Sequence, residues 1–107
     1  MSLFADYWTE KGHLIVETER GFMSAICFGE TCYVDNFYVR PEHRGTGSAL
    51  QITLQTIERA KALGCKRFCA EIYKADPLYE YNLKLDKHFG MEVHADTPYK
   101  TVLSKEI

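Results

Sequence analysis

Hydrophobic and polar residues follow a two-residue period over the first part of the chain, which is typical of β-strands. Residues 13–18 place Leu, Ile and Val between polar ends, residues 22–28 form a second apolar run, and residues 31–39 form a third. The Gly29-Glu30 pair between the last two runs suits a tight hairpin turn. The chain therefore predicts an antiparallel meander, in which one face of the third strand is formed by Tyr33, Asp35, Phe37 and Val39.

After the third predicted strand, the spacing of hydrophobic residues changes to that of an α-helix. Residues 47–63 repeat apolar residues at helical spacing, and Gly64 is a natural helix stop. The apolar arc of this predicted helix consists of Ala49, Leu50, Ile52, Leu54, Ile57, Ala60 and Leu63. Residues 65–74 predict another strand, so the strand-helix-strand order implies a crossover to a parallel neighbour.

A second helix is predicted to begin at Asp76 and Pro77, which suit an N-cap and a first helical position. The helix is expected to end near His88, before Gly90. Its packing positions are Leu78, Tyr81, Leu85 and Phe89.

Three short segments complete the prediction. Residues 91–95 and 99–104 predict two final strands, and residues 3–10 predict a short helix that needs a docking surface. The expected fold class is α/β (α+β). It has a mixed, partly parallel sheet in the order β-β-β-α-β-α-β-β with a short helix in front.

Composition suits one domain spanning residues 1–107, because 46% of the 107 residues are apolar and 13% aromatic. The formal charge of -2 gives no broad basic surface, which argues against nucleic acid as a partner. No apolar run approaches the roughly 20 residues of a membrane span. The N-terminus lacks the basic leader of a signal peptide. We expect a cytoplasmic protein that binds neither nucleic acid nor membrane.

The four cysteines, Cys27, Cys32, Cys65 and Cys69, form no C-x-x-C pair, and the nearby histidines do not fall at metal spacing. Buried, reduced thiols are the expectation, with no metal site.

The segment V-R-P-E-H-R-G-T-G-S-A-L, residues 39–50, joins the third predicted strand to the first long helix. A glycine turn that opens a helix presents free backbone N–H groups and the positive end of the helix dipole, so it suits a phosphate. The alternative is an ordinary turn with a surface arginine. No Lys-Ser/Thr follows, which excludes a P-loop, and the preceding meander argues against a dinucleotide fold.

This segment resembles the coenzyme signature of the GNAT family of N-acetyltransferases, Q/R-x-x-G-x-G/A. Arg44, Gly47 and Ala49 match its three positions, and Val39 and Pro41 match the residues that usually precede it. The element order from His13 onward matches the family core as well. The resemblance implies acetyl-CoA as cosubstrate, with its pyrophosphate on Arg44, Gly45, Thr46, Gly47, Ser48 and Ala49. It also implies that pantetheine pairs with the backbone of Phe37, Tyr38 and Val39.

The chain departs from the family pattern at its front. Family members usually carry a strand and two helices there, which form much of the acceptor groove, and this chain has only a short segment. The groove is therefore either unusually open or completed by a second subunit in a homodimer. Phe4, Tyr7 and Trp8 are too apolar to leave in water, and they cover either a sheet edge or a partner.

The second predicted helix also departs from the family pattern N-x-x-A-x-x-x-Y. Counting back from Gly90, these three positions hold Tyr79, Asn82 and Asp86, so the usual catalytic tyrosine is missing from its place. The three residues share one stripe, which implies that Asn82 and Asp86 face the coenzyme.

Acetyl transfer needs a proton for the departing thiolate and a base for the amine. A phenol suits the first role, and Tyr79 is our candidate acid, with Tyr81 as the alternative. An aspartate suits it only if burial raises its pKa. Asp35 is our candidate base, with Glu71 as its rival. No histidine has a nucleophile at recognisable spacing, so direct attack by the amine is expected.

Two functions remain open at this point. The lead reading is transfer of an acetyl group from acetyl-CoA to a primary amine on a small molecule or peptide. The alternative is a non-catalytic acyl-CoA-binding or protein-interaction module on a reduced GNAT fold. The small net charge does not identify the acceptor.

Overall fold

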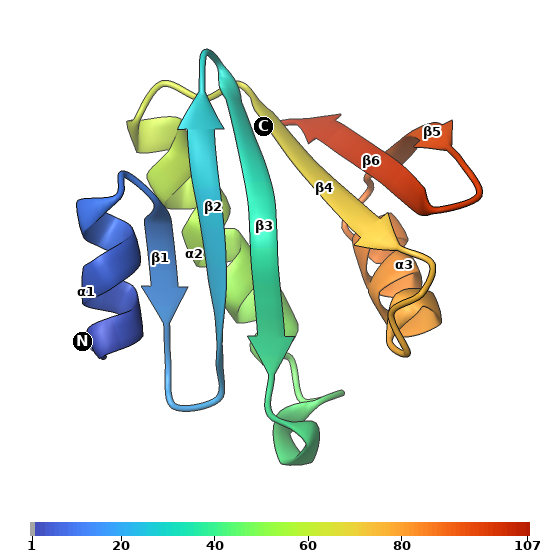
Figure 1. Ribbon diagram of the computed structural model, residues 1–107, viewed down its shortest axis with the longest axis horizontal. Coiled ribbons are helices and arrows are strands. Elements are labelled where there is room, and N and C mark those ends of the chain that lie inside the picture. Colours follow the sequence, from blue (N-terminus) through green and yellow to red (C-terminus); the bar gives the residue numbers. More distant parts are fainter. Residues whose placement is uncertain (1) are drawn as a thin grey trace.

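The computed structural model describes residues 2–107 as a six-stranded sheet with three α-helices (Figure 1). The strands are β1 (Leu14–Glu17), β2 (Gly21–Phe28), β3 (Thr31–Val39), β4 (Arg67–Tyr73), β5 (Glu92–Asp96) and β6 (Lys100–Glu106). The helices are α1 (Leu3–Glu10), α2 (Ser48–Ala62) and α3 (Tyr79–His88), with a 3-10 turn at Pro41–His43.

The sheet order is β1-β2-β3-β4-β6-β5, and only β3 and β4 are parallel. The meander, the crossover through α2 and the mixed α/β class are therefore confirmed. None of the helices among residues 2–107 is both long enough and apolar enough to cross a membrane.

Helices α2 and α3 cover one face of the sheet, and the other face is largely exposed. The helix face packs against α2 and α3 and contains Met23, Ala25, Cys32, Phe68, Ala70 and Ile72. The other face, which we call the open face, contains Ile26, Tyr33, Glu71 and Tyr73, all exposed. On the open face α1 docks beside β1, where the Phe4 and Phe22 rings lie 5.0 Å apart and the Trp8 and His13 rings 4.7 Å apart. The aromatic residues of α1 thus cover a sheet edge of their own chain.

The buried face of α2 is narrower than its sequence predicts. Leu50, Leu54 and Leu63 are exposed, whereas Thr53 and Thr56 are buried. The two threonine hydroxyls donate to the carbonyl oxygens of the preceding turn, Ala49 O at 2.8 Å and Ile52 O at 2.9 Å. Because these bonds satisfy the hydroxyls within the helix, threonine can occupy core positions that hydropathy assigns to leucine.

The single face predicted for β3 is wrong, because the strand contains a β-bulge. Ala25 pairs with Val34 and Ser24 pairs with Asn36, so the ladder with β2 skips Asp35. The extra residue reverses the alternation. Tyr33 lies on the open face, whereas Phe37 and Val39 pack against the core on the helix face.

The helix predicted from Asp76 begins later, at Tyr79, with Leu78 as its N-cap. Asp76 instead accepts a hydrogen bond from the Leu78 N–H at 2.8 Å in the preceding turn. Tyr79, Leu83, Leu85 and Phe89 pack against the core, so Tyr79 and Leu83 replace Leu78 and Tyr81 of the predicted face.

The four cysteines are free thiols, and three of them are buried. Burial raises the pKa of the Cys65 thiol to about 11. Reduced cysteines, as expected, serve as core residues here.

Candidate active site

The parallel pair β3-β4 separates halfway along its length. Thr31 to Val34 pair with Arg67 to Ala70, and the two strands then diverge, as Figure 1 shows. A cavity of about 200 Å³ occupies the space between them. Its walls come from β2, β3, β4, α2 and α3, and they include Asp35, Phe37, Thr53, Glu71, Asn82 and Asp86.

The β3 backbone beyond Val34 has no β4 partner on the cavity side. This free edge includes the main chain of Phe37, Tyr38 and Val39, although Val39 O accepts a hydrogen bond from Arg44 Nε at 3.0 Å. An extended ligand lying in the gap would find unpaired strand groups there, in the manner of an added β-strand.

The loop from Arg44 to Gly47 leads directly into α2. Gly45 and Gly47 adopt positive φ angles of 79° and 87°, and no atom lies within 4 Å of the position that a Cβ would take at either residue. The first backbone bond of α2 runs from Gln51 N to Gly47 O, and no side chain caps the helix. The N–H groups of Ser48, Ala49 and Leu50 are thus outside the helical bonds, in the arrangement that binds an anion.

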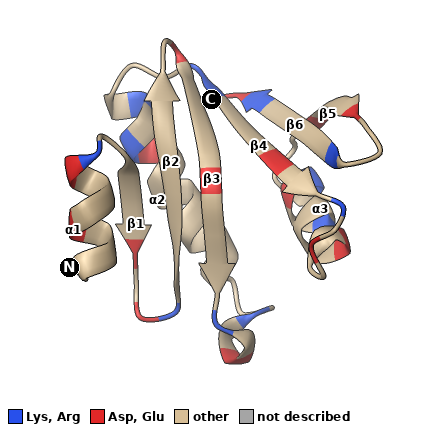
Figure 2. Cartoon of the chain, viewed as in Figure 1, with Lys and Arg blue, Asp and Glu red and all other residues tan. Residues whose placement is uncertain are grey.

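Two arginines flank this loop. Arg44 lies over the Tyr38 ring at 5.8 Å, and Arg20 Nη1 donates to the buried Ser48 hydroxyl at 3.4 Å. Figure 2 shows basic residues in the β1–β2 turn and in the loop after β3, at the same end of the sheet. Their charges add to the helix dipole and favour a phosphate group at this end.

A second pocket opens on the open face of the sheet. It is lined only by β3 and β4, through Tyr33, Val34, Asp35, Cys69, Glu71 and Tyr73. Four of these residues, Val34, Asp35, Glu71 and Tyr73, also line the cavity on the helix side. The two pockets therefore border the same gap between β3 and β4, one on each face of the sheet.

Asp35 occupies this junction and is held by neighbouring polar groups. Its Oδ1 accepts a 2.5 Å hydrogen bond from Ser24 Oγ, which in turn accepts one from Asn36 Nδ2 at 3.2 Å. His13 Nδ1 lies 3.1 Å from Asp35 Oδ2, at ion-pair distance but without the alignment of a hydrogen bond. The bulge places this carboxylate where it can reach both pockets.

The rival carboxylate, Glu71, has different partners. Its Oε1 lies 3.1 Å from Lys100 Nζ, and its Oε2 accepts a hydrogen bond from the Tyr73 hydroxyl at 3.2 Å. Both carboxylate oxygens of Glu71 are thus engaged, by Lys100 and by Tyr73.

Asp86 reaches the cavity from α3 together with Asn82. Burial raises the pKa of the Asp86 carboxyl to about 7, far above the usual range of an aspartate. The group therefore exchanges a proton near neutral pH.

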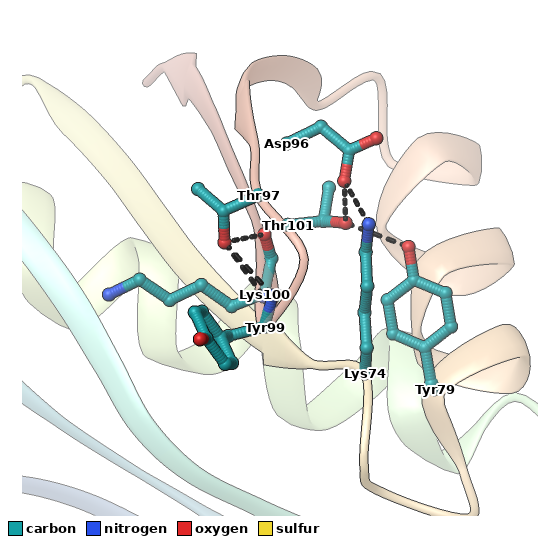
Figure 3. Close-up of polar contacts among 7 residues, drawn as sticks. All are labelled: Lys74, Tyr79, Asp96, Thr97, Tyr99, Lys100 and Thr101. Atoms are coloured by element: carbon teal, nitrogen blue, oxygen red, sulfur yellow. Dashed lines mark hydrogen bonds and ion pairs between the residues drawn. The ribbon is translucent and has the colours of Figure 1, made fainter.

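Tyr79 lies two turns before Asp86 on α3 and is part of a different network (Figure 3). Its hydroxyl lies 2.7 Å from Thr101 Oγ1, which donates to Asp96 Oδ1 at 3.1 Å. Lys74 Nζ pairs with the same carboxylate oxygen at 2.6 Å. This hydrogen bond and ion pair lower the pKa of Asp96 and raise that of Lys74. The network ties the end of β4 and the start of α3 to the β5–β6 hairpin.

Comparison with known families gives one match, and it covers most of the chain. The model of the Acetyltransferase (GNAT) family matches residues 3–82. The chain belongs to the GNAT acetyltransferase family. No curated protein matched the sequence.

Solved structures agree with this GNAT assignment at the level of the fold. An aminoglycoside 6'-N-acetyltransferase complexed with coenzyme A has a TM-score of 0.79 and 11% identity, covering 97% of this chain and 78% of that one. The IAA acetyltransferase of Bacillus cereus has a TM-score of 0.77 and 13% identity, covering 99% and 85%. The PaiA N-acetyltransferase of Thermoplasma acidophilum in complex with coenzyme A has a TM-score of 0.74 and 12% identity, covering 82% and 54%. This chain thus spans about half of the last protein.

In this GNAT fold the predicted site residues lie in three places. Arg44 to Ala49 form the loop and first turn at the α2 N-terminus, and Phe37 to Val39 form the free edge of β3. Asp35, Asn82 and Asp86 line the cavity between β3 and β4. The structure holds the Tyr79 hydroxyl in the Thr101 network instead, and Tyr79 does not belong to the cavity lining among residues 2–107.

The sequence prediction missed two residues that contact the candidate site of this GNAT fold. His13 meets Asp35 across three strands, and Arg20 reaches the α2 N-terminus from the β1–β2 turn. Both contacts join residues more than twenty positions apart, so they depend on sheet register rather than on any local spacing. The turn composition around Arg20 carries no signal for such a contact.

Proposed function

We propose that this acetyltransferase moves an acetyl group from acetyl-CoA to a primary amine by direct attack. The observation that supports it most is that a cavity beside α2 and α3 and a pocket on the open face share four lining residues at the gap between β3 and β4. Two substrates can approach one point from opposite faces of the sheet, as a direct transfer requires.

The coenzyme would occupy the helix side. Its pyrophosphate fits the free N–H groups of Ser48 to Leu50 beside Arg44 and Arg20. From there the pantetheine arm can pair with the free β3 edge and carry the thioester to the cavity. Unpaired strand N–H groups at this edge would polarise the thioester carbonyl.

The amine would approach from the open face, where Asp35 and Glu71 line the pocket. Asp35 is the proposed base, because Ser24 and His13 fix its carboxylate at the junction. It would take the proton that the amine nitrogen must lose on forming the amide. No side chain needs to become acylated in this scheme.

The first test is binding. Calorimetry with acetyl-CoA should give saturable binding to the wild-type protein, and Arg44→Gln should weaken it by about tenfold, because a charge-assisted contact to phosphate is lost. Lys61→Gln removes one positive charge from the exposed last turn of α2 and is the matched control. Equal affinity of Arg44→Gln and wild type would contradict the loop assignment.

The second test is turnover on a panel of amines: an aminoglycoside, a polyamine, a peptide with a free N-terminus and a peptide with a lysine. Released coenzyme A should be measured by chromatography. Binding without product on the whole panel would favour the non-catalytic alternative.

A further inference from the structure

Asp86 is a half-buried ionisable group to which the proposed reaction assigns no chemical step. It projects from α3 into the cavity between β3 and β4. Within residues 2–107 it takes part in none of the ion pairs, and burial is the cause of its raised pKa. An unpaired carboxyl facing a ligand cavity is more typical of a functional group than of a structural one.

The position of Asp86 relative to the two pockets indicates which of the two substrates it faces. Asp35 lines both pockets, whereas Asp86 lines only the cavity on the helix side. The coenzyme reaches the junction from that side, because the loop of Arg44 continues into α2, which also lines the cavity through Thr53. The sulfur atom that departs is thus on the side of Asp86, and the amine is on the side of Asp35.

We propose that Asp86 is the catalytic residue that protonates the departing thiolate of coenzyme A, an inference that rests on the acetyltransferase function proposed above. The Asp86 carboxylic acid faces the helix side of the cavity, opposite the base, so the two proton transfers occur at separate atoms.

The step balances as follows. The amine nitrogen uses its lone pair to form a bond to the thioester carbonyl carbon, and the C–S bond breaks with its electron pair on sulfur. The Asp86 hydroxyl gives its proton to that sulfur, which yields the free thiol and an Asp86 carboxylate. Asp35 takes the proton from the nitrogen, which yields the neutral amide. Exchange with solvent restores both carboxyl groups.

The protonation state required at Asp86 follows from its surroundings. A pKa of about 7 keeps a large part of the carboxyl protonated at neutral pH and close to the acidity of a thiol. The titratable groups facing the same cavity are Asp35 on β3, Glu71 and Tyr73 on β4, and Asp76 before α3, while α2 contributes only Thr53. Among residues 2–107, the cavity lining thus contains no basic side chain that would stabilise the carboxylate.

The alternative donor, Tyr79, is engaged elsewhere. Its hydroxyl is bonded to Thr101 in the network that fixes the β5–β6 hairpin (Figure 3). A proton delivered by Tyr79 would require that this bond break first.

The test compares Asp86→Asn with Asp86→Glu in the 107-residue chain, using the best amine of the panel. Asp86→Asn should lower kcat by about a hundredfold or more, with little change in KM for acetyl-CoA, because it removes the acid but keeps the shape. The wild-type kcat should fall above about pH 7 as Asp86 ionises, and Asp86→Asn should lose this limb. Asp86→Glu should retain part of the rate.

Glu80→Gln makes the same carboxyl-to-amide change at an exposed position of α3 and should behave as wild type. Calorimetry with acetyl-CoA and a thermal melt show whether each variant folds and binds. Wild-type turnover with an undiminished kcat in Asp86→Asn would overturn the Asp86 assignment alone. A large loss in Tyr79→Phe with none in Asp86→Asn would do the same. Binding of acetyl-CoA by the wild type without turnover on any amine would overturn the proposed function, and the Asp86 assignment with it.

Discussion

A single carboxyl on α3 connects the stability of this protein to the pH. The Asp86 pKa is about 7 in the folded protein, against about 3.9 for an unperturbed aspartate. The folded state therefore binds this proton more tightly than the unfolded state. The resulting stabilisation is complete below about pH 4 and is lost as the pH rises through 7.

We predict that Asp86→Asn stabilises the protein at alkaline pH. A pKa difference of about three units corresponds to about 4 kcal/mol above pH 7, and the neutral amide avoids this cost. Urea unfolding at pH 5 and pH 8 should show a smaller loss of stability in Asp86→Asn than in the wild type. Glu80→Gln, at an exposed position on the same helix, should follow the wild-type curve. Equal losses in all three proteins would place Asp86 in water rather than in the cavity.

At the scale of elements, the turn into α2 combines a backbone requirement with a ligand requirement. Gly47 is the N-cap of α2 with a φ of 87°, a conformation that costs other residues about 1 kcal/mol. The space beside it is open, as the approach of a phosphate requires. Gly64 has a φ of 92° after the other end of the same helix, also with open space beside it.

Variants of Gly47 and Gly64 can separate the backbone requirement from the ligand requirement. Gly47→Ala and Gly64→Ala should each destabilise the fold by about 1 kcal/mol, because both place a Cβ at positive φ. Only Gly47→Ala should also weaken acetyl-CoA binding, since its methyl group lies beside the proposed pyrophosphate site. Chemical denaturation and calorimetry measure the two effects. Equal affinities of the two variants would argue against a ligand at this turn.

The sequence predicted the elements better than their faces. The periods located all three helices and six strands, and the Arg44 motif located the loop, because both signals are local. The face of β3 was wrong after Val34, since one extra residue at Asp35 leaves no mark in composition. The buried face of α2 was too wide, because Thr53 and Thr56 satisfy their hydroxyls inside the helix.

At the scale of the whole molecule, the site depends on contacts between distant segments. Helix α1 packs Trp8 against His13, and His13 lies beside Asp35. The helix at the front of the chain thus supports the proposed base, although none of its residues lines either pocket. Such contacts arise only once the sheet register is set, which explains why the sequence did not reveal His13.

We predict that Trp8→Ala lowers both stability and kcat. Removing the indole should destabilise the fold by about 3 kcal/mol, because it leaves a void over β1, and the freed His13 should no longer hold Asp35. Thermal melts and steady-state kinetics measure these effects. Leu3→Ala, at a position 88% exposed on the same helix, should change neither. A destabilised Trp8→Ala protein with wild-type kcat would separate α1 from catalysis.

Because Asp35 is the extra residue of the β3 bulge, the proposed base occupies a position that the strand pairing does not need. Val34 and Asn36 already pair with adjacent residues of β2, so loss of one codon at Asp35 would leave an uninterrupted ladder with every other side chain on its present side. Ancestors and descendants of this gene could therefore gain or shed the carboxylate through a three-nucleotide indel while the architecture stays intact.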